Sequence, residues 1–550
     1  MTTTPDTPVA GTVIEFDTPF VGDDLYTRAN AGEVFPELLS PLSWTLLGPA
    51  LERGFMRCMA DDFAAIEPLP GGYRACGRMA GRLHLNLSVF RTVAERAPGS
   101  SADDLDKQYF GDAVASGLPG HPKEKVPLTT TLRCTGAGLR TMASIDRRVK
   151  RETRLAAEAA AARTALLASG PTPRQALDAA RGELDLYSAL FGSHVTARAL
   201  TASAVSLAMG ALTKRGLSDD QALALISDIP DIESAKPSKE LSAIAAAAAP
   251  AARSAVLEGA DWAELGAATD PDIVALRTEL EAFLATYGHR GVNEFDPAWP
   301  VWGTQPDAVL SLLRRILAAG AGTERARTPG EVPGGVAGFL VRNARKAIHR
   351  AENTKDNIIR VCHDLRLYLD AAFAGLAEQL TREEALALSI EELLAVADGG
   401  PVPGELIARR RAEIEAALLI TPAEWSMHEL TVAHEEAAAG ITELVGLAGS
   451  QGVVRGRVRV MRDVDDAFED DEVLVAATTD TAWTPLFLAA AAVVTDTGGP
   501  LSHATIVARE LGIPAVVNTK TAVRDLQDGD LVEVDGTAGV VRIIERGASA

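Results

Sequence analysis

The stretch "TDTGGPLSHATIVARELGIPAVV", from Thr495 to Val517, decides how the end of this chain folds. Its two ends are rich in valine and other strand-forming residues, and the segment from His503 to Leu511 has the length of a short helix. Ser502 is predicted to cap the start of that helix, and Gly512, followed by Pro514, is predicted to end it. A single histidine therefore stands at the first turn of a helix.

The start of this helix is suited to binding phosphate. Backbone N–H groups in the first turn have no partners within the helix, and the helix dipole adds positive potential there. His503 is largely neutral near pH 7, so one ring nitrogen can attack a phosphoryl group, while Ser502 offers a hydroxyl donor. Gly498 and Gly499 permit a close approach of the backbone. On local grounds alone, a lone histidine beside a turn is more often a structural residue at a helix start.

The strand-like texture extends over about the last 110 residues. After a strand that begins at Gly452, further strands are predicted at 471–480, 491–499, 513–518 and 530–544. We therefore predict a small mixed β domain with few helices at residues 441–550. The linker before it is expected between about Glu435 and Leu447.

The preceding part of the chain, residues 1–440, has the pattern of amphipathic helices. Segments such as "AGFLVRNARKAIHRAENTKDNIIRVCHDLRLYLDAAFAGLAEQL" place apolar residues at helical spacing with charges between them. The alanine-rich patch "AIAAAAAPAAR" is predicted to be a helix interrupted by Pro250. The fold class is thus multidomain, with a mainly α-helical N-terminal domain and a β-rich C-terminal domain.

Composition limits the partners of this chain. The formal charge of -22 results from 53 basic and 75 acidic residues, and the basic residues are scattered, so neither nucleic acid nor an anionic membrane is expected as the main partner. Four cysteines lie far apart without a CxxC pair, which predicts free thiols and no metal site. The longest apolar run near the C-terminus, Leu486 to Val494, is far shorter than the roughly 20 residues that span a bilayer. With no signal peptide visible at the N-terminus, a cytoplasmic location is expected.

The opening stretch resembles the phosphohistidine motif of the phosphoenolpyruvate-utilising enzymes. The segments "GRVRV", "TDTAWTPLF" and "DGDLVEVDGTAGVVRI" occur in the order and spacing of that family's swivelling domain, so the resemblance covers roughly residues 445–545. It implies a swivelling β/β/α domain that moves between an ATP-grasp domain and the site where the phosphoryl group is delivered. Its implied catalytic residue is His503, and the implied phosphate-binding residues are Gly498, Gly499, Ser502 and Thr505.

Two positions depart from the family pattern. Thr505 stands where the family usually has alanine. Leu501 stands where plant-type pyruvate phosphate dikinase has a regulatory threonine, so that mode of regulation is not expected.

Several N-terminal segments are similar to the second domain of rifampin phosphotransferases. They are "LYTRANAGEVFPELLSPLSW", "GRLHLNLSVFR" and "YGHRGVNEFDPAWPVW", in that order. The similarity implies that the helical domain at 1–440 binds the acceptor of the phosphoryl group. Tyr26, Phe35, Leu38 and Trp44 could line an apolar acceptor pocket, although aromatic residues among leucines more often belong to a core.

A charged loop supplies the candidate acceptor-site residues, which are His289, Arg290, Glu294 and Asp296. Together these side chains could provide a base, a phosphate-neutralising cation and carboxylates beside an acceptor hydroxyl. The alternative interpretation is a buried ion-pair network that braces a loop between helices. Sequence alone leaves both open.

The leading hypothesis is a phosphotransferase component in which His503 passes a phosphoryl group to a hydroxyl of a small molecule. There is no GxxxxGK[ST] loop and no apparent room for an ATP-grasp domain before "LYTRANAGE", so a separate ATP-grasp subunit carrying Mg-ATP is expected as partner, and no cofactor on this chain alone. The chain also ends at Ala550 without the barrel of the pyruvate-linked members, which disfavours pyruvate as acceptor. Two alternatives remain: a lyase or hydrolase that uses His503 as acid or base, and a non-catalytic regulatory module.

Overall fold

The structure is a computed structural model that describes most of the chain. The residues it does not describe are 1–13, 68–71, 98–99, 108–117, 123–124, 228, 230–232, 234–235, 319–331, 421, 432–440, 463–467, 469–470, 480–482, 500–501 and 548–550.

The chain forms two compact units, each assembled from separated segments. Unit 1 comprises Met1–Leu200, Phe295–Trp299 and Asn353–His434, and unit 2 comprises Thr201–Glu294, Pro300–Glu352 and Glu435–Ala550. Two long helices, α6 (Pro173–Thr213) and α13 (Gly335–Leu376), contribute residues to both units. The domain division at 440 and 441 stays a prediction, and each unit is described by itself below.

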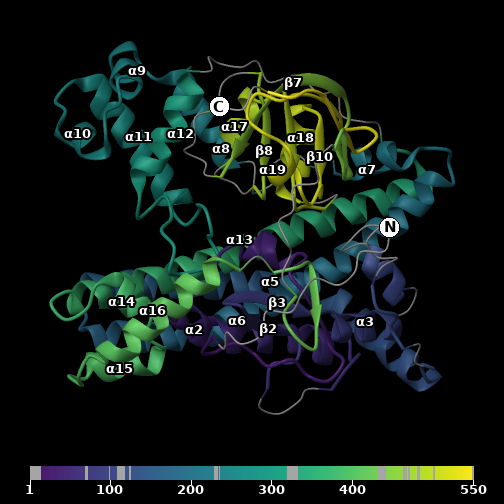
Figure 1. Ribbon diagram of the computed structural model, residues 1–550, viewed down its shortest axis with the longest axis horizontal. Helices are drawn as coiled ribbons and strands as arrows, with labels where there is room; N and C mark the ends of the chain where they lie inside the picture. Colours follow the sequence, from purple (N-terminus) through teal and green to yellow (C-terminus); the bar gives the residue numbers. More distant parts are fainter. Residues whose placement is uncertain are drawn as a thin grey trace. The chain divides into compact units, whose positions relative to one another are not determined.

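Unit 1 combines a small antiparallel sheet with long helices (Figure 1). The strand order is β2-β3-β1-β4, with β1 at Leu25–Thr27, β2 at Cys76–Met79, β3 at Arg82–Asn86 and β4 at Trp425–Met427. Besides its parts of α6 and α13, the unit contains α1 (Ala31–Val34), α2 (Pro41–Met56), the π-helix η1 (Arg57–Asp62), α3 (Leu87–Arg96), α5 (Leu128–Ala168), α14 (Arg382–Leu386), α15 (Ile390–Ala397) and α16 (Gly404–Leu418).

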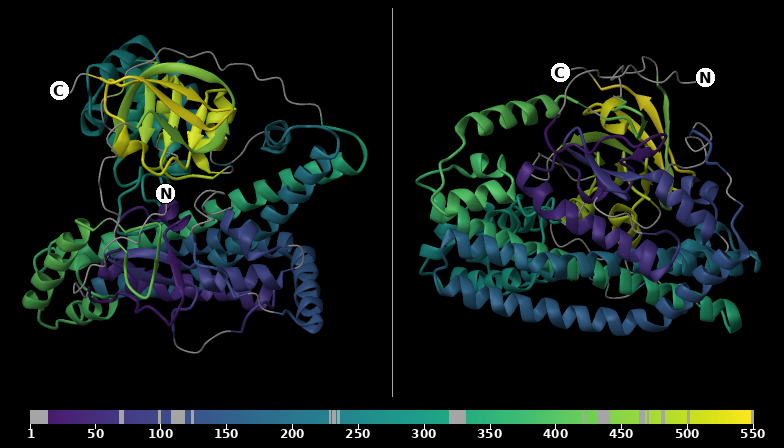
Figure 2. Two further views of the ribbon diagram at one scale, coloured as in Figure 1. Left: turned by 45° about the vertical axis from the view of Figure 1, so that its right-hand side comes forward. Right: turned by 90° about the horizontal axis from the view of Figure 1, so that it is seen from below.

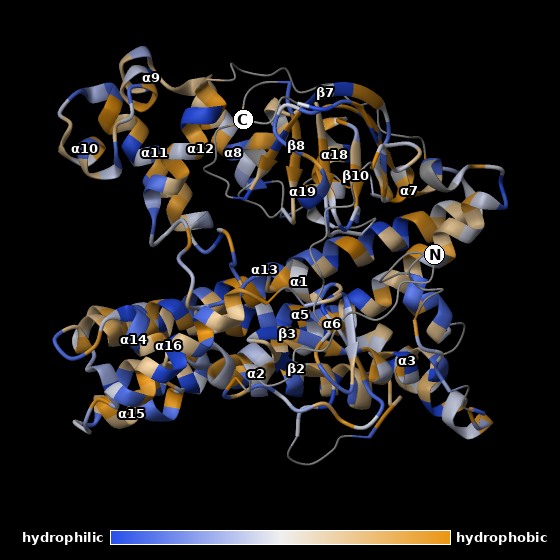
Figure 3. Ribbon diagram, in the orientation of Figure 1, coloured by the Kyte–Doolittle hydropathy of each residue, from blue (hydrophilic) through white to orange (hydrophobic). Residues whose placement is uncertain are grey.

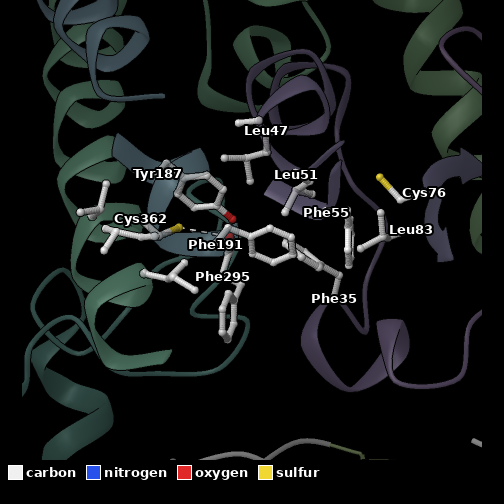
Figure 4. Packing of buried hydrophobic residues seen from close by; sticks show 14 of the residues in the cluster. Phe35, Leu47, Leu51, Phe55, Cys76, Leu83, Tyr187, Phe191, Phe295 and Cys362 are labelled. Carbon is white, nitrogen blue, oxygen red and sulfur yellow. Dashed lines mark hydrogen bonds between the residues drawn. The ribbon is translucent and has the colours of Figure 1, made fainter. Parts of the chain in front are cut away.

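An aromatic core joins the helices of unit 1 to its sheet. Figure 4 shows Phe55 of α2 beside Phe191 of α6, with Phe35 and Phe295 nearby. Phe55 and Phe191 meet edge to face with their ring centroids 5.0 Å apart, which is a favoured aromatic geometry. Tyr26, Phe35 and Trp44 are at most 3% exposed, so the core interpretation of these aromatic residues is confirmed.

The helical part of unit 2 lies between the two long helices in sequence. It contains α7 (Asp219–Ser227), α8 (Lys236–Ala247), α9 (Pro250–Leu257), α10 (Trp262–Ala267), α11 (Pro271–Tyr287) and α12 (Pro306–Ala318). The predicted interruption at Pro250 is confirmed, because α8 ends before it and Pro250 occupies the first turn of α9, where its missing N–H has no helical partner to lose. The helices show the alternation of polar and apolar residues that their sequence predicts (Figure 3).

The C-terminal part of unit 2 is built on an eight-stranded mixed sheet of order β5-β12-β11-β7-β8-β9-β10-β6 (Figures 1 and 2). Its strands are β5 (Glu443–Val445), β6 (Leu447–Ser450), β7 (Val453–Met461), β8 (Val473–Ala476), β9 (Ala492–Thr495), β10 (Ala515–Val517), β11 (Leu531–Asp535) and β12 (Val540–Glu545). Three short helices accompany them, α17 (Thr484–Ala489), α18 (His503–Leu511) and α19 (Ala522–Asp525). The predicted mixed β domain with few helices is therefore confirmed.

Two local predictions need correction. The segment 530–544 forms a hairpin of β11 and β12 rather than one strand, because the turn before Gly539 reverses the chain. The predicted linker from Glu435 to Leu447 extends too far, since β5 lies within it. Leu444 of β5 is buried and pairs with Val541 of β12.

The cysteines and the most apolar helix both contribute to the buried interior of the protein. All four cysteines are free and buried. Among the described residues, one helix, α6, is long and apolar enough to cross a membrane, with 33% of the relevant window buried. Leu177, Tyr187 and Leu190 of this helix are buried in helix-packing cores, so α6 does not indicate a membrane protein.

Candidate functional site

The histidine motif lies at one edge of the parallel part of the unit 2 sheet. Strands β8, β9 and β10 run parallel, and α18 connects β9 to its neighbour β10 (Figure 1). The helix therefore starts beside the carboxyl ends of these strands, where open α/β sheets bind their ligands. His503 is its first residue, as predicted. The side chain of His503 lies outside the described part of the structure.

The two ends of α18 follow the sequence prediction in position. Gly512 ends the helix with φ +68°, a left-handed conformation that favours glycine. Ser502 occupies the N-cap position, but its hydroxyl makes no capping hydrogen bond to the N–H groups of the first turn. Ser502 is thus the N-cap residue as predicted, although it does not cap the helix through its side chain.

The Ser502 hydroxyl instead joins a short hydrogen-bonded network. Thr505 is fully buried, and its hydroxyl donates to the carbonyl oxygen of Gly499 at 2.8 Å. The Ser502 Oγ lies 3.1 Å from Thr505 Oγ1, and the Ser502 N–H donates to the same Gly499 carbonyl. Threonine at 505 thus fixes the turn that precedes His503, and this bond gives a structural reason for its departure from alanine.

The two glycines of the motif have different environments. Gly498 has φ +134°, and a Cβ built on it would lie 3.0 Å from Ser502 Oγ and 3.3 Å from the Val517 Cβ. At Gly499 a Cβ would meet nothing within 4 Å among the described residues, which do not include 500 and 501. Gly498 is therefore required by the backbone and its packing, whereas Gly499 leaves open space next to the helix start.

Asp496 organises the same edge and was missed by the sequence analysis. Its carboxylate accepts hydrogen bonds from the Ala522 N–H at 2.5 Å, the Val523 N–H at 3.3 Å and the Thr519 hydroxyl at 3.0 Å. It therefore ties the loop after β9 to the start of α19. Burial raises the pKa of Asp496, and these hydrogen bonds act in the opposite direction. In the sequence, only its position between Thr495 and Thr497, directly after a predicted strand, could have indicated this role.

The helix itself is anchored on two sides. Ala504, Val507 and Ala508 pack into the core beside the sheet. Ile506 is buried with residues of α6 and α13 within unit 2, including Ala208 and Val341. The first turn of α18 is thereby held in place while the Ser502 side chain leaves its amides uncapped. Such a helix start can accept an anion.

Three of the four candidate acceptor residues belong to unit 2. His289, Arg290 and Glu294 are each at most 5% exposed. Arg290 Nε lies 2.9 Å from Glu294 Oε2, so the two form a buried ion pair. The loop that contains them folds back on itself, with the Trp302 N–H donating to the Arg290 carbonyl oxygen at 2.9 Å.

The fourth candidate, Asp296, belongs to unit 1. Its Oδ1 accepts hydrogen bonds from the Ser43 hydroxyl at 2.6 Å and from the Ala298 N–H at 2.9 Å. Burial raises its pKa, and the Ser43 hydrogen bond acts against that rise. Arg366 of α13 donates to the Asp296 carbonyl oxygen, which fixes the same segment. These contacts match the bracing interpretation of Asp296.

Metal binding has no candidate in the described residues. No group of three or more His, Cys, Asp or Glu side chains among them could hold a metal ion.

Two family models match parts of this chain. The model for the PEP-utilising enzyme mobile domain matches residues 468–539, which include β8 to β11 and α18. The model for the rifampicin phosphotransferase fourth domain matches residues 194–352, which include α7 to α12.

Curated relatives match similar portions. The rifampicin phosphotransferase of Streptomyces sviceus is 30% identical over 298 residues, covering 49% of this chain and 34% of that protein. The Bacillus cereus rifampicin phosphotransferase is 28% identical over 303 residues, with coverages of 49% and 34%. The prodigiosin synthesizing transferase PigC of Serratia marcescens is 32% identical over 317 residues, with coverages of 51% and 35%. The chain thus spans about a third of the length of these relatives.

Proposed function

Because residues 468–539 match the PEP-utilising enzyme mobile domain and residues 194–352 match the rifampicin phosphotransferase fourth domain, we propose that His503 is the phosphoryl carrier of a phosphotransferase. The chain is a phosphotransferase component. In the proposed reaction, a phosphoryl group moves from ATP to His503 and then to a hydroxyl of a small molecule bound by the helical part.

The proposed reaction has two balanced steps. In the first, an imidazole nitrogen of His503 attacks the γ-phosphorus of ATP, a P–N bond forms, and the bond to the ADP oxygen breaks. In the second, the acceptor oxygen attacks the same phosphorus, the P–N bond breaks, and the hydroxyl proton passes to a base. Both steps depend mainly on positioning and on neutralising the charge of the phosphoryl oxygens.

The observation that carries this proposal is the uncapped start of α18 at the carboxyl edge of β8, β9 and β10. The first-turn N–H groups and the helix dipole favour phosphoryl oxygens beside His503. The network of Ser502, Thr505 and Gly499 holds this turn in one conformation, so little reorganisation is needed when the phosphoryl group binds. The open space at Gly499 is where that group can approach.

On the acceptor side we propose His289, Arg290 and Glu294. The Arg290 guanidinium can neutralise the incoming phosphoryl group, and Glu294 or His289 can take the hydroxyl proton. Arg290 and Glu294 form an ion pair at 2.9 Å and are both buried, so solvent does not separate them. Asp296 has a supporting role in this proposal, because its Oδ1 is engaged by Ser43 and Ala298.

The phosphoryl donor is proposed to be an ATP-grasp domain on a separate subunit, which would hold Mg-ATP. His503 would then be phosphorylated only when that subunit is present. The proposal includes neither a nucleic acid nor a membrane among the partners.

Mass spectrometry of the phosphorylated chain tests the proposal. The purified chain is incubated with ATP, with and without extract from its own cells, and acid-labile phosphate is mapped. We expect phosphate on His503 only with the extract, and none on a His503→Ala variant. A His349→Ala variant serves as control, because that histidine lies on α13 outside the motif.

Other outcomes identify the alternatives. A complete lack of label, with extract from a strain that expresses the neighbouring genes, contradicts the carrier role. Turnover of a phosphorylated compound by the purified chain, unaffected by ATP, would identify a lyase or hydrolase that uses His503 as acid or base. Labelling without extract would remove the need for a separate subunit.

A further inference from the structure

Two arginines of unit 1, Arg28 and Arg82, are hydrogen-bonded to backbone carbonyl oxygens. Arg28 follows β1, and its Nη2 donates to the carbonyl oxygens of Phe35 at 3.2 Å and Pro36 at 3.0 Å. Arg82 begins β3, and its Nη1 donates to the carbonyl oxygen of Ala417 at 3.0 Å. Across the described parts of the chain, Arg28 Nη1 is buried and has no hydrogen-bond partner. Among the described residues, the hydrogen bonds of these two guanidinium groups go to neutral oxygens, and the Glu37 carboxylate acts on both groups through its charge.

Three other arginines of unit 1, all buried, each have a carboxylate partner. Their ion pairs are Arg78 with Asp17 at 2.9 Å, Arg91 with Asp106 at 2.8 Å, and Arg410 with Glu15 at 2.9 Å. A guanidinium removed from water is costly unless an anion faces it. Burial, followed by the charge of Arg82, lowers the pKa of Arg28 to about 10. Glu37 acts to raise the pKa of both arginines, which leaves two guanidinium charges facing one carboxylate and a net positive charge on the cluster.

A buried histidine completes the cluster. His84 of β3 is 0% exposed, and its Nδ1 donates to the carbonyl oxygen of Arg82 at 3.0 Å. Burial, and then the charge of Arg28, lowers the pKa of His84 to about 3, so the ring is neutral. Within the described residues its Nε2 has no hydrogen-bond partner and presents a lone pair.

The strand register brings these residues together. Thr27 of β1 pairs with Leu85 of antiparallel β3, so position 28 lies opposite position 84. Gly32, four residues after Arg28, lies beside its guanidinium group, and a Cβ on Gly32 would lie 3.4 Å from Arg28 Nη2. The absence of a side chain leaves the guanidinium uncovered on that side. Arg28 and Arg82 are both partly exposed, which gives an anion a route of approach.

We propose that Arg28, Arg82 and His84 form a binding site for a protonated phosphate oxyanion. The two guanidinium groups would donate to phosphate oxygens and supply the missing charge balance. The Nε2 lone pair of His84 would accept a hydrogen bond from a P–OH group. Sulfate has the same tetrahedral shape and at least as much negative charge, but it carries no O–H near neutral pH, so a preference for phosphate would report the hydrogen bond to His84. This inference does not depend on the role of His503.

Two sources share this chemistry: free inorganic phosphate and the phosphoryl group of a phosphorylated small molecule. Methyl phosphate separates them at pH 6, where about half of a phosphate monoester still carries an O–H. Binding of methyl phosphate within a few-fold of inorganic phosphate assigns the site to a phosphorylated small molecule. Exclusion of methyl phosphate assigns it to free phosphate.

Isothermal titration calorimetry of the full chain at pH 6 tests the site. We expect saturable one-to-one binding of inorganic phosphate and weaker binding of sulfate. Arg28→Gln and Arg82→Gln should each weaken phosphate binding about tenfold or more, which is the usual effect of losing one charge-assisted hydrogen bond. His84→Leu should remove the preference over sulfate, whereas His84→Gln keeps an acceptor and should retain part of it.

Matched controls keep the test decisive. Arg140→Gln removes one charge from an exposed position on α5 and should leave phosphate binding unchanged. His503→Ala should also retain it, which separates this site from the carrier proposal. Thermal unfolding identifies variants that fail to fold, and the wild-type comparison of phosphate with sulfate requires no variant. No saturable phosphate binding to the wild type, or equal binding of sulfate, overturns the proposal.

Discussion

Replacing each of the two adjacent glycines by alanine provides a sharp test of the site geometry. Gly498→Ala places a Cβ at 3.0 Å from Ser502 Oγ and 3.3 Å from the Val517 Cβ, on a backbone with φ +134°. Gly499→Ala places a Cβ where nothing lies within 4 Å. The same chemical change thus meets two different environments one residue apart.

The expected magnitudes follow from these environments. An unfavourable backbone conformation costs about 1–3 kcal/mol, and overpacking costs about 1–3 kcal/mol more, so Gly498→Ala should lower the free energy of unfolding by about 2–5 kcal/mol. Gly499→Ala should change it by no more than about 0.5–1 kcal/mol. In a domain of this size, 1 kcal/mol corresponds to roughly 4–8 °C in Tm.

Differential scanning calorimetry of the full chain measures both variants. We expect the transition of the β-rich domain to shift down by about 8 °C or more for Gly498→Ala and to stay nearly unchanged for Gly499→Ala. Hydrogen exchange of the α18 amides identifies which transition belongs to this domain. Equal shifts for the two variants, or a larger shift for Gly499→Ala, would refute the assignment of Gly498 to packing and Gly499 to open space.

Three further predictions concern single side chains. Burial raises the pKa of Glu183 to about 7, so its contribution to stability is present below the unfolded value near 4.5 and is lost as the pH rises through about 7. Glu183→Gln should therefore flatten the fall in urea midpoint between pH 5 and 8, whereas the exposed control Glu378→Gln should not; an unchanged fall would contradict the assignment. Asp296→Asn keeps an acceptor for Ser43 and Ala298, so activity and Tm should remain near wild type. Glu294→Gln, in contrast, should lower phosphoryl transfer about 10²-fold or more if Glu294 is the base, and equal activities of the two variants would count against it. Thr505→Ala loses the hydrogen bond to Gly499 and should lower the domain Tm by about 4–8 °C, while Thr497→Ala, whose hydroxyl is exposed, serves as its control in the same calorimetric scan.

Most of the β-rich domain was predictable, because its elements are short and locally encoded. Valine-rich runs bounded by turn residues predicted β8, β9 and β10, and Gly512 with Pro514 predicted the end of α18. The sequence predicts one strand where β11 and β12 form a hairpin, because valines occur on both sides of the turn in "DGTAGVV". Strand β5 was missed, since three residues on an edge strand depend on their partner more than on their own sequence.

The residues of the candidate site could be predicted from the sequence, but their hydrogen bonds could not. The motif predicted where His503, Ser502 and the glycines lie along the chain. The sequence did not reveal that Ser502 bonds to Thr505 instead of capping the helix, nor that Asp496 ties two loops together. Both depend on contacts between segments that are separated in sequence, which a local pattern does not encode.

The sequence by itself determined the resemblance to the PEP-utilising mobile domain, the mixed β domain at the end of the chain, and the position of a histidine at a helix start, because motif, hydrophobic period and turn residues are local properties. Only the tertiary structure distinguished the environment of Gly498 from that of Gly499 and showed that Asp296 bonds to Ser43 while Arg290 pairs with Glu294. It alone also brought Arg28 opposite His84, which lies 56 positions away in the chain (84 minus 28). The charge around a side chain and the space open to it depend on all the residues that surround it in the folded protein. Strand pairing brings such residues together even when they are far apart in the sequence.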